Sequence, residues 1–157
     1  MNLQKLFLTF FYSGLSPYAP GTAGSILAGF IGFVILQYFH TDTLFLLTIL
    51  ITLIAIAEIN KYEARTSSHD DKSIVIDEVV GLWLAFVLSS TTITQMLLSF
   101  VFFRIFDIWK PSLIGKIDKN VKGGLGVMGD DILAGILAGI CSAGSWQAIE
   151  YIIGHIK

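Results

Sequence analysis

The chain has 157 residues, of which 54% are hydrophobic and only 14% are charged, and its mean hydropathy is +0.75. Soluble domains carry about 25% charged residues, so this composition excludes an ordinary water-soluble domain and indicates a membrane protein. A formal net charge of −2 without a basic block argues against a nucleic-acid partner. Because no linker or repeat divides the chain, we treat residues 1–157 as one membrane-embedded domain.

The first half of the chain predicts an N-terminal interfacial helix and two apolar segments. The opening stretch, MNLQKLFLTFFYSGLSP, has one lysine and no clear cleavage site, so we expect an amphipathic helix at the membrane surface, not a removed signal peptide. Apolar segments follow at 24–39 and 44–59, joined by HTDT. The stretch EINKYEARTSSHDDKS, where charges first cluster, is expected to be a loop or a helix extension in water.

Three further apolar segments complete the predicted fold, at 74–88, 95–108 and 131–153. A hydrocarbon core of roughly 30 Å needs about 20 helical residues, and fewer where neighbours bury the segment. The lysine- and glycine-rich stretch KPSLIGKIDKNVKGGLGVMG separates the last two segments. The sequence therefore predicts an all-α, polytopic membrane helix bundle with about five hydrophobic helical segments.

The hydroxyl-rich stretch SSTTIT, at 89–94, decides the topology. As a turn, it gives five crossings and places the N-terminal loop, the 58–76 loop and the 109–130 loop on one face. As the polar middle of a single span, it sends the last loop to the opposite face. Consecutive hydroxyl residues compete with helical hydrogen bonds, which favours the turn, although Ser and Thr can also bond back to their own helix inside a membrane.

Five crossings also gather the charges on one side. Nine of the ten basic residues then lie together, and the positive-inside rule assigns that face to the cytoplasm. Ten of the twelve acids lie there as well, with only Asp42 and Glu150 opposite. Because both signs are mixed on one face, this distribution indicates a site that binds a charged ligand.

Two pairs of adjacent acids are candidate site residues. Asp77 and Glu78 interrupt the apolar run IVIDEVVG near the water interface, where a charge is costly and is usually retained for function. In the plain alternative, Asp77 caps the third helix and Glu78 interacts with its dipole. Asp130 and Asp131 follow glycines that provide either a hinge or a close approach to an anion. One of them could cap the fifth helix, but adjacent carboxylates repel each other unless a cation lies between them.

The stretch FRIFDIWKP adds charges of both signs. Arg104, Asp107 and Lys110 follow one another at intervals of three and so share a helix face. An ion pair between Arg104 and Asp107 is the simple interpretation, and it is compatible with a ligand site. Carboxylates suit a hard divalent cation such as Mg²⁺, whereas Arg and Lys neutralise phosphoryl oxygens. Together with Lys122, these residues predict metal-assisted phosphoryl transfer.

Four blocks strengthen this hypothesis: GLSPYAPGTAGS (14–25), HDDKSIVIDEVVGLW (69–83), FRIFDIWKPSLIGKID (103–118) and GGLGVMGDDILAG (123–135). In order and spacing the chain resembles the phosphatidylglycerophosphatase A family of magnesium-dependent lipid phosphatases. FDIWKP and GDDILAG are highly specific, whereas PGTAGS alone would be weak. The family often has an aromatic residue in place of Ser112 and a bulkier residue in place of Gly129. Neither departure removes a charge, so they bear on headgroup fit.

The resemblance implies hydrolysis of the terminal phosphomonoester of phosphatidylglycerol phosphate, with Mg²⁺, at the cytoplasmic face of the bacterial inner membrane. A phospholipid in the bilayer is then the expected partner, and the small residues of AGILAGI would also suit a homo-oligomer. Thr22, at the start of the first segment, either helps to receive an anion or simply caps the helix. By position, the resemblance implies phosphate contacts for Arg104 and Lys110, and metal or catalytic roles for Asp77, Glu78, Asp107, Asp130 and Asp131.

Two other functions remain open at this point. A CDP-alcohol phosphotransferase would also use carboxylates and a divalent ion, but its dense helical signature with an Ala-Arg pair is absent from the sequence. A small ion transporter or channel subunit would need acids distributed through the depth of the bundle, whereas here they gather at one end.

Overall fold

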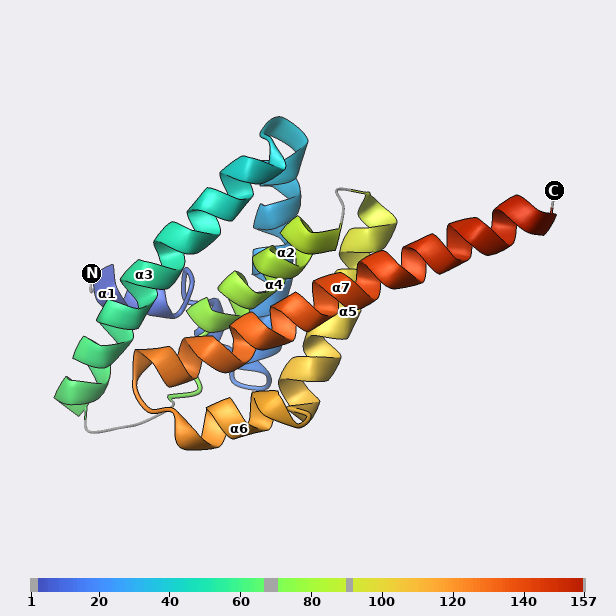
Figure 1. The fold of residues 1–157 in the computed structure, drawn as a ribbon. Coiled ribbons are helices and arrows are strands. Elements are labelled where there is room, and N and C mark those ends of the chain that lie inside the picture. The colour runs from blue at the N-terminus through green and yellow to red at the C-terminus, as the bar shows by residue number, and fades with distance from the viewer. Residues whose placement is uncertain (1–2, 67–70, 90–91, 157) are drawn as a thin grey trace.

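The computed structural model describes residues 3–66, 71–89 and 92–156, and every regular element within these ranges is helical (Figure 1). The predicted all-α bundle is therefore confirmed. In chain order the elements are α1 (Leu3–Leu8), the 3₁₀ turn η1 (Ser13–Leu15), α2 (Pro20–Tyr38), α3 (Thr41–Thr66), α4 (Ile76–Ser89), α5 (Ile93–Trp109), α6 (Leu113–Asn120) and α7 (Gly124–Ile156).

The 89–94 stretch separates two helices. Helix α4 ends at Ser89, and α5 begins after Thr92, whose hydroxyl accepts a hydrogen bond from the Gln95 backbone N–H. The Ser99 hydroxyl of α5 donates to the Ser89 hydroxyl (2.9 Å), so the two helices fold back on each other. Residues 90 and 91 of the predicted turn lie outside the described residues. The alternative of one continuous span is wrong.

Within the described residues, three helices are long and apolar enough to cross a membrane: α2, α3 and α7. Helices α4 and α5 have 14 and 17 residues. At 1.5 Å per residue they extend only about 21 and 26 Å, less than a hydrocarbon core of roughly 30 Å. The predicted hydrophobic segments are therefore present as helices, while five full crossings stay a prediction.

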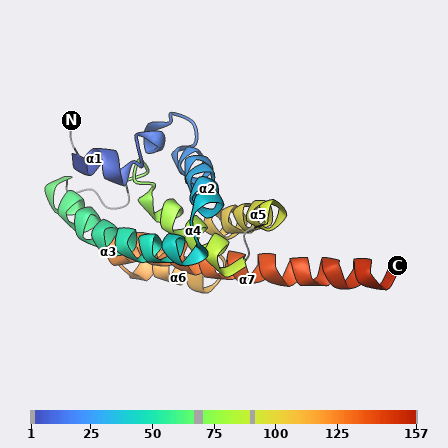
Figure 2. The ribbon, with the colours of Figure 1, turned by 90° about the horizontal axis from the view of Figure 1, so that it is seen from above.

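Helix α4 forms the centre of the bundle, packed against α2, α3, α5 and α7 (Figures 1 and 2). Its side chains are apolar nearly all round, and Val79, Leu82 and Phe86 are at most 2% exposed. The Trp83 indole N–H donates to the Ala28 carbonyl of α2 (2.8 Å), which satisfies its one polar atom. Because other helices enclose α4, it does not need the length of a lipid-facing span.

Small residues allow α4 and α7 to cross at close range. A Cβ on Gly135 of α7 would collide with the carbonyl oxygen of Gly81 on α4, and one on Gly139 would meet Ala85. Ala138, on the same face of α7, is fully buried. The AGILAGI stretch thus packs against α4 of its own chain. Beyond this crossing, the C-terminal half of α7 extends past the other helices in both views (Figures 1 and 2).

Helix α7 begins seven residues earlier than the sequence pattern predicted. Its first residue, Gly124, packs so closely on the Ile56 backbone of α3 that no side chain fits, and its N–H donates to Asn60 Oδ1 (2.8 Å). The glycines there form the first turns of a helix, not a hinge. Asp130 and Asp131 lie about two turns inside α7, so the interpretation of either as an N-cap is wrong.

The structure also shows which parts of the polar stretches are helical. Helix α3 continues to Thr66, which is the predicted helix extension. Helix α1 covers only six residues, and the segment is tied to the bundle: Leu8 is buried, and the Gln4 amide donates to the Glu58 carboxylate (2.9 Å). Helix α6 was not predicted from the sequence; its inner face carries the fully buried Ile114.

The crossing of α4 and α7 gives a stability prediction. Gly135→Ala should lower the free energy of unfolding by about 1–3 kcal/mol, because the added methyl group forces the two backbones apart. Gly144→Ala is the matched control, since it lies on the same helix with nothing within 4 Å of its Cβ position. Thermal unfolding in detergent, followed by circular dichroism, measures both variants. Equal stability of the two would contradict the close packing.

Candidate active site

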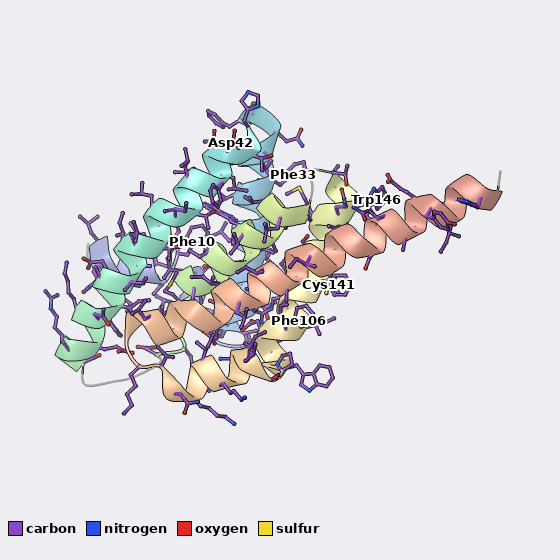
Figure 3. All side chains as sticks on the ribbon, viewed as in Figure 1. Phe10, Phe33, Asp42, Phe106, Cys141 and Trp146 are labelled. Atoms are coloured by element: carbon purple, nitrogen blue, oxygen red, sulfur yellow. The ribbon has the colours of Figure 1, made fainter. Side chains whose placement is uncertain are left out.

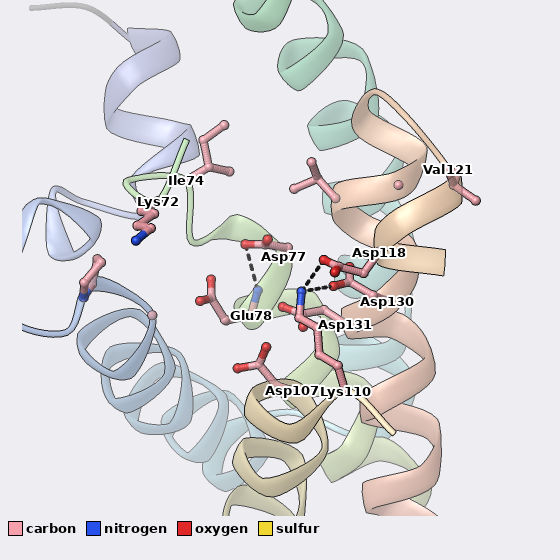
Figure 4. Close-up of a pocket in the computed structure, with 14 residues that line it drawn as sticks. Lys72, Ile74, Asp77, Glu78, Asp107, Lys110, Asp118, Val121, Asp130 and Asp131 are labelled. Atoms are coloured by element: carbon pink, nitrogen blue, oxygen red, sulfur yellow. Dashed lines mark hydrogen bonds and ion pairs between the residues drawn. The ribbon is translucent and has the colours of Figure 1, made fainter. Parts of the chain in front are cut away.

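Several helix ends meet at one cavity of about 330 Å³ (Figure 4). The start of α2, the start of α4, the end of α5, helix α6 and the second turn of α7 all contribute. The predicted convergence of distant acids is therefore present in the fold. Six carboxylates and two lysines line the cavity: Asp77, Glu78, Asp107, Asp118, Asp130, Asp131, Lys72 and Lys110.

The first turn of α4 supplies Asp77 and Glu78. Asp77 is the second residue of the helix and not its N-cap, and its Oδ1 accepts the Glu78 backbone N–H (3.1 Å). The Glu78 side chain reaches the start of α2, where a Cβ on Gly21 would collide with its Oε1. In this arrangement the carboxylate of Glu78 occupies the space that a side chain at position 21 would take.

Three of the acids could hold a metal ion together. Asp77, Glu78 and Asp131 each offer one carboxylate oxygen, and these oxygens lie within 4.8 Å of one another. Among the described residues, Glu78 Oε2 and Asp130 Oδ1 are buried and have no hydrogen-bond partner. Buried polar atoms without partners are costly. A hard cation, which prefers oxygen ligands, fits this set of donors.

Arg104 connects α5 to the first turns of α2. Its guanidinium donates to Asp107 Oδ2, to the Ser25 hydroxyl (3.2 Å) and to the Thr22 hydroxyl (3.3 Å). The predicted ion pair with Asp107 is thus present. The N-cap of α2 is Ala19, without a side-chain cap bond, so the interpretation of Thr22 as a simple cap is wrong. Thr22 instead helps to fix the arginine at the edge of the site.

Lys110 reaches the acids because the chain turns sharply after α5. Lys110 and Ser112, on either side of Pro111, both adopt positive φ values, of 44° and 47°. After this turn α6 packs against α7, and the Lys110 ammonium group donates to Asp118 Oδ1 and Asp130 Oδ2 (2.5 and 2.7 Å). Burial favours the neutral amine, but the two carboxylates outweigh it and raise the pKa of Lys110 well above its usual range. The lysine therefore stays charged at neutral pH.

The structure differs from the sequence-based prediction in which lysines line the cavity. Lys122 is exposed and does not line the cavity, whereas Lys72, from the segment before α4, does. Asp118 was not predicted as a site residue, although it is the last residue of the 103–118 block. Its only sequence signal is a position eight residues after Lys110, which becomes meaningful once the Pro111 turn is known.

Comparison with known proteins agrees with this geometry. The model of the family described as phosphatidylglycerophosphatase A matches residues 6–146. The chain belongs to this family. It is 41% identical over 156 residues to Phosphatidylglycerophosphatase A of Escherichia coli, and the aligned region covers 98% of this chain and 85% of that protein. The Haemophilus influenzae protein of the same name is 36% identical over 139 residues, covering 88% and 85%.

Another relative carries a different name. A protein of Bacteroides thetaiotaomicron, provisionally named a phosphatidylinositol-3-phosphatase, is 39% identical over 149 residues, covering 90% of this chain and 92% of its own. No solved structure matches the chain significantly. The related names share one chemistry, removal of a phosphate from a lipid headgroup, and differ in the headgroup itself.

The four sequence blocks that resemble the phosphatidylglycerophosphatase A family come together at the cavity. Each of the four blocks identified in the sequence contributes to the same place: the first brings Gly21 and Thr22, the second Asp77 and Glu78, and the last Asp130 and Asp131. The third, 103–118, contributes the charged residues of α5, the turn and α6. All four blocks lie within the residues that match the family model.

Divalent-ion binding tests the three-acid group. Asp131→Asn should weaken binding of Mn²⁺, used as a paramagnetic probe, by about 10–100-fold because it removes a negative ligand from the cluster. Asp42→Asn is the control, since Asp42 lies at the turn between α2 and α3, away from the cavity (Figure 3). Electron paramagnetic resonance of the purified protein gives the free Mn²⁺. Unchanged affinity in Asp131→Asn would contradict a metal site there.

Proposed function

We propose that the protein is a magnesium-dependent lipid phosphatase that hydrolyses the terminal phosphomonoester of phosphatidylglycerol phosphate to phosphatidylglycerol and inorganic phosphate. The observation that carries this proposal is the meeting of six carboxylates and Lys110 around one cavity at the ends of apolar helices, with Arg104 bound to one of these carboxylates, Asp107, at the edge of the cavity. The names of two relatives support the choice of headgroup.

The position of the cavity suits a substrate that stays in the bilayer. Helices long enough to cross a membrane end at the cavity, so it lies at one end of the bundle, where a lipid headgroup meets water. The acyl chains would remain beside the helices while the phosphate enters. We assign this end to the cytoplasmic face of a bacterial inner membrane because the expected five-crossing topology puts nine of the ten Lys and Arg residues on this side.

The metal and the basic residues have complementary roles. When bound by Asp77, Glu78 and Asp131, Mg²⁺ would neutralise phosphoryl oxygens and polarise the phosphorus. Arg104 uses its five N–H donors partly on Asp107, Ser25 and Thr22, which fixes the orientation of the donors left for phosphate.

Lys110 supplies a second positive charge. Two of its three N–H donors are taken by Asp118 and Asp130, and the third is left for a phosphoryl oxygen. Because both carboxylates accept hydrogen bonds from the ammonium group, Lys110 is fixed in the cavity before substrate arrives. A phosphate that enters therefore meets charges that are already positioned.

Hydrolysis then needs a water molecule and a proton acceptor. A water oxygen attacks the phosphorus in line with the ester bond, and a carboxylate accepts the proton that the water loses. Glu78 Oε2 and Asp130 Oδ1 have unused capacity to accept it. The bond between phosphorus and the headgroup oxygen breaks, and that oxygen takes up a proton and leaves as the hydroxyl of glycerol.

The transporter alternative requires acids along the depth of the bundle. Among the described residues, the acids that line a cavity all belong to the end where α4 begins, and Asp42 and Glu150 lie on the outside of other helix ends. This distribution supports a site at one surface more than a path across the membrane.

Phosphate release tests the proposed reaction. Purified protein should release inorganic phosphate from phosphatidylglycerol phosphate with Mg²⁺ and none after chelation with EDTA. Asp77→Asn should reduce the rate by about 100-fold or more, because it removes a charge that would face the metal, while Asp42→Asn should keep it. Phosphatidylinositol 3-phosphate serves as the competing substrate. Cation flux in liposomes without phosphate release would instead favour the transporter.

The role of Arg104 gives a separate test. Arg104→Lys keeps the charge but loses the planar fork that contacts α2 and Asp107, so kcat/KM should fall by about 10–100-fold, equivalent to a lost charge-assisted hydrogen bond of about 1.5–3 kcal/mol. Arg65→Lys, on the exposed end of α3, is the matched control. The assay is phosphate release over a range of substrate concentrations. Equal kcat/KM in the two variants would remove Arg104 from the phosphate-binding site.

A further inference from the structure

A second hollow lies next to the active site, between α2 and α5. It is an apolar groove of about 390 Å³, with Gly29, Phe30 and Phe33 on one wall and Ile93, Leu97 and Phe100 on the other. Phe30, Ile93 and Leu97 are more than 60% exposed on its outer edge, so the groove opens sideways toward the bilayer. Every residue that lines it is apolar.

The groove begins where the active site ends. Gly29 lies one helical turn after Ser25 on α2, and Phe100 lies one turn before Arg104 on α5. Ser25 and Arg104 are hydrogen-bonded to each other (3.2 Å). The same contact between α2 and α5 therefore borders the phosphate-binding end on one side and the groove on the other.

Together with the helical turn that separates it from Arg104, the groove extends along α5 over a distance comparable with one leaflet of a bilayer. From Arg104 to Ile93, helix α5 descends about 16 Å at 1.5 Å per residue. Half of a hydrocarbon core of roughly 30 Å is about 15 Å. An occupant that starts at the headgroup level beside Arg104 would thus reach the far end of the groove near the middle of the bilayer.

We propose that this groove binds one fatty acyl chain of the lipid substrate. The inference rests on the proposed function, because it assumes that the phosphate in the cavity belongs to a lipid. A linear, apolar chain joined to an anionic headgroup fits the order of features along α2 and α5: first Thr22 and Arg104, then only hydrocarbon surface.

The groove would contribute more to the orientation of the lipid substrate than to its binding affinity. A chain that leaves the surrounding lipid for the groove exchanges one apolar environment for another, so hydrophobic transfer contributes little. Packing between the phenylalanine rings instead limits the directions from which the headgroup can enter. Correct placement of a reacting group by such contacts can change rates by about 100-fold per ångström of displacement.

Gly29 keeps the groove open. A Cβ at this position would lie 3.6 Å from Leu82 Cδ2 and 3.7 Å from Phe100 Cδ2, which are ordinary contact distances. Alanine therefore fits, whereas a larger side chain must extend into the groove or displace Phe100. The position thus separates a variant that blocks the groove from one that only adds a methyl group.

The experiment compares diacyl phosphatidylglycerol phosphate with its deacylated, water-soluble headgroup. Gly29→Leu should lower kcat/KM for the diacyl lipid by about tenfold or more and leave kcat/KM for the deacylated compound unchanged. Gly29→Ala should behave like the wild type on both substrates. Gly144→Leu is the matched control, because a Cβ at position 144 would meet nothing within 4 Å.

Equal losses on both substrates, or no loss on either, would overturn the groove proposal while the proposed function stands. Failure of the wild type to hydrolyse the diacyl lipid would overturn the proposed function instead. A diacyl lipid with a diazirine near the chain end gives a readout without turnover: it should label residues 26–33 and 93–100, and less so in Gly29→Leu. Labelling spread evenly over α3 and α7, or cross-links to a second copy in the groove, would also overturn the proposal.

Discussion

Repulsion among carboxylates in a confined space is the constraint on which this structure depends. Six acids share the cavity, and the available cations neutralise only part of them. Lys110 holds Asp118 and Asp130, and Arg104 holds Asp107. Of the six acids that line the cavity, Asp77, Glu78 and Asp131 have no salt bridge with a described basic residue, and these are the three whose oxygens come close enough to share an ion. The salt bridges of Asp107, Asp118 and Asp130 thus leave the other three acids available to bind a metal ion.

The fold keeps these repelling groups together by removing side chains where helices cross. Gly81 and Gly135 allow α4 and α7 to touch along their backbones, which fixes the start of α4 beside the second turn of α7. Gly21 leaves room beside α2 for the carboxylate of Glu78. Because the contact between α4 and α7 is made by backbone atoms in a close-packed interior, it cannot relax to spread the acids apart without loss of packing elsewhere.

The sequence predicted the helical segments and the acids because both are local signals. An apolar run predicts a membrane helix, and Asp77 and Glu78 are conspicuous because they interrupt such a run. The start of α7 was misplaced because glycines usually indicate turns, whereas here Gly124 is held in a helix by its contact with α3. Asp118 and Lys72 could not be selected, since their nearness to the site depends on turns that no local pattern specifies.

For a lipid phosphatase, the position of the cavity at the end of the bundle has a consequence for its products. Inorganic phosphate is released next to water and diffuses away in three dimensions, while the dephosphorylated lipid can only move sideways within its own leaflet. The two products separate at once because one is soluble in water and the other remains in the bilayer. They would therefore rarely meet again at the site. The physical separation of the two products then follows from where the helices end.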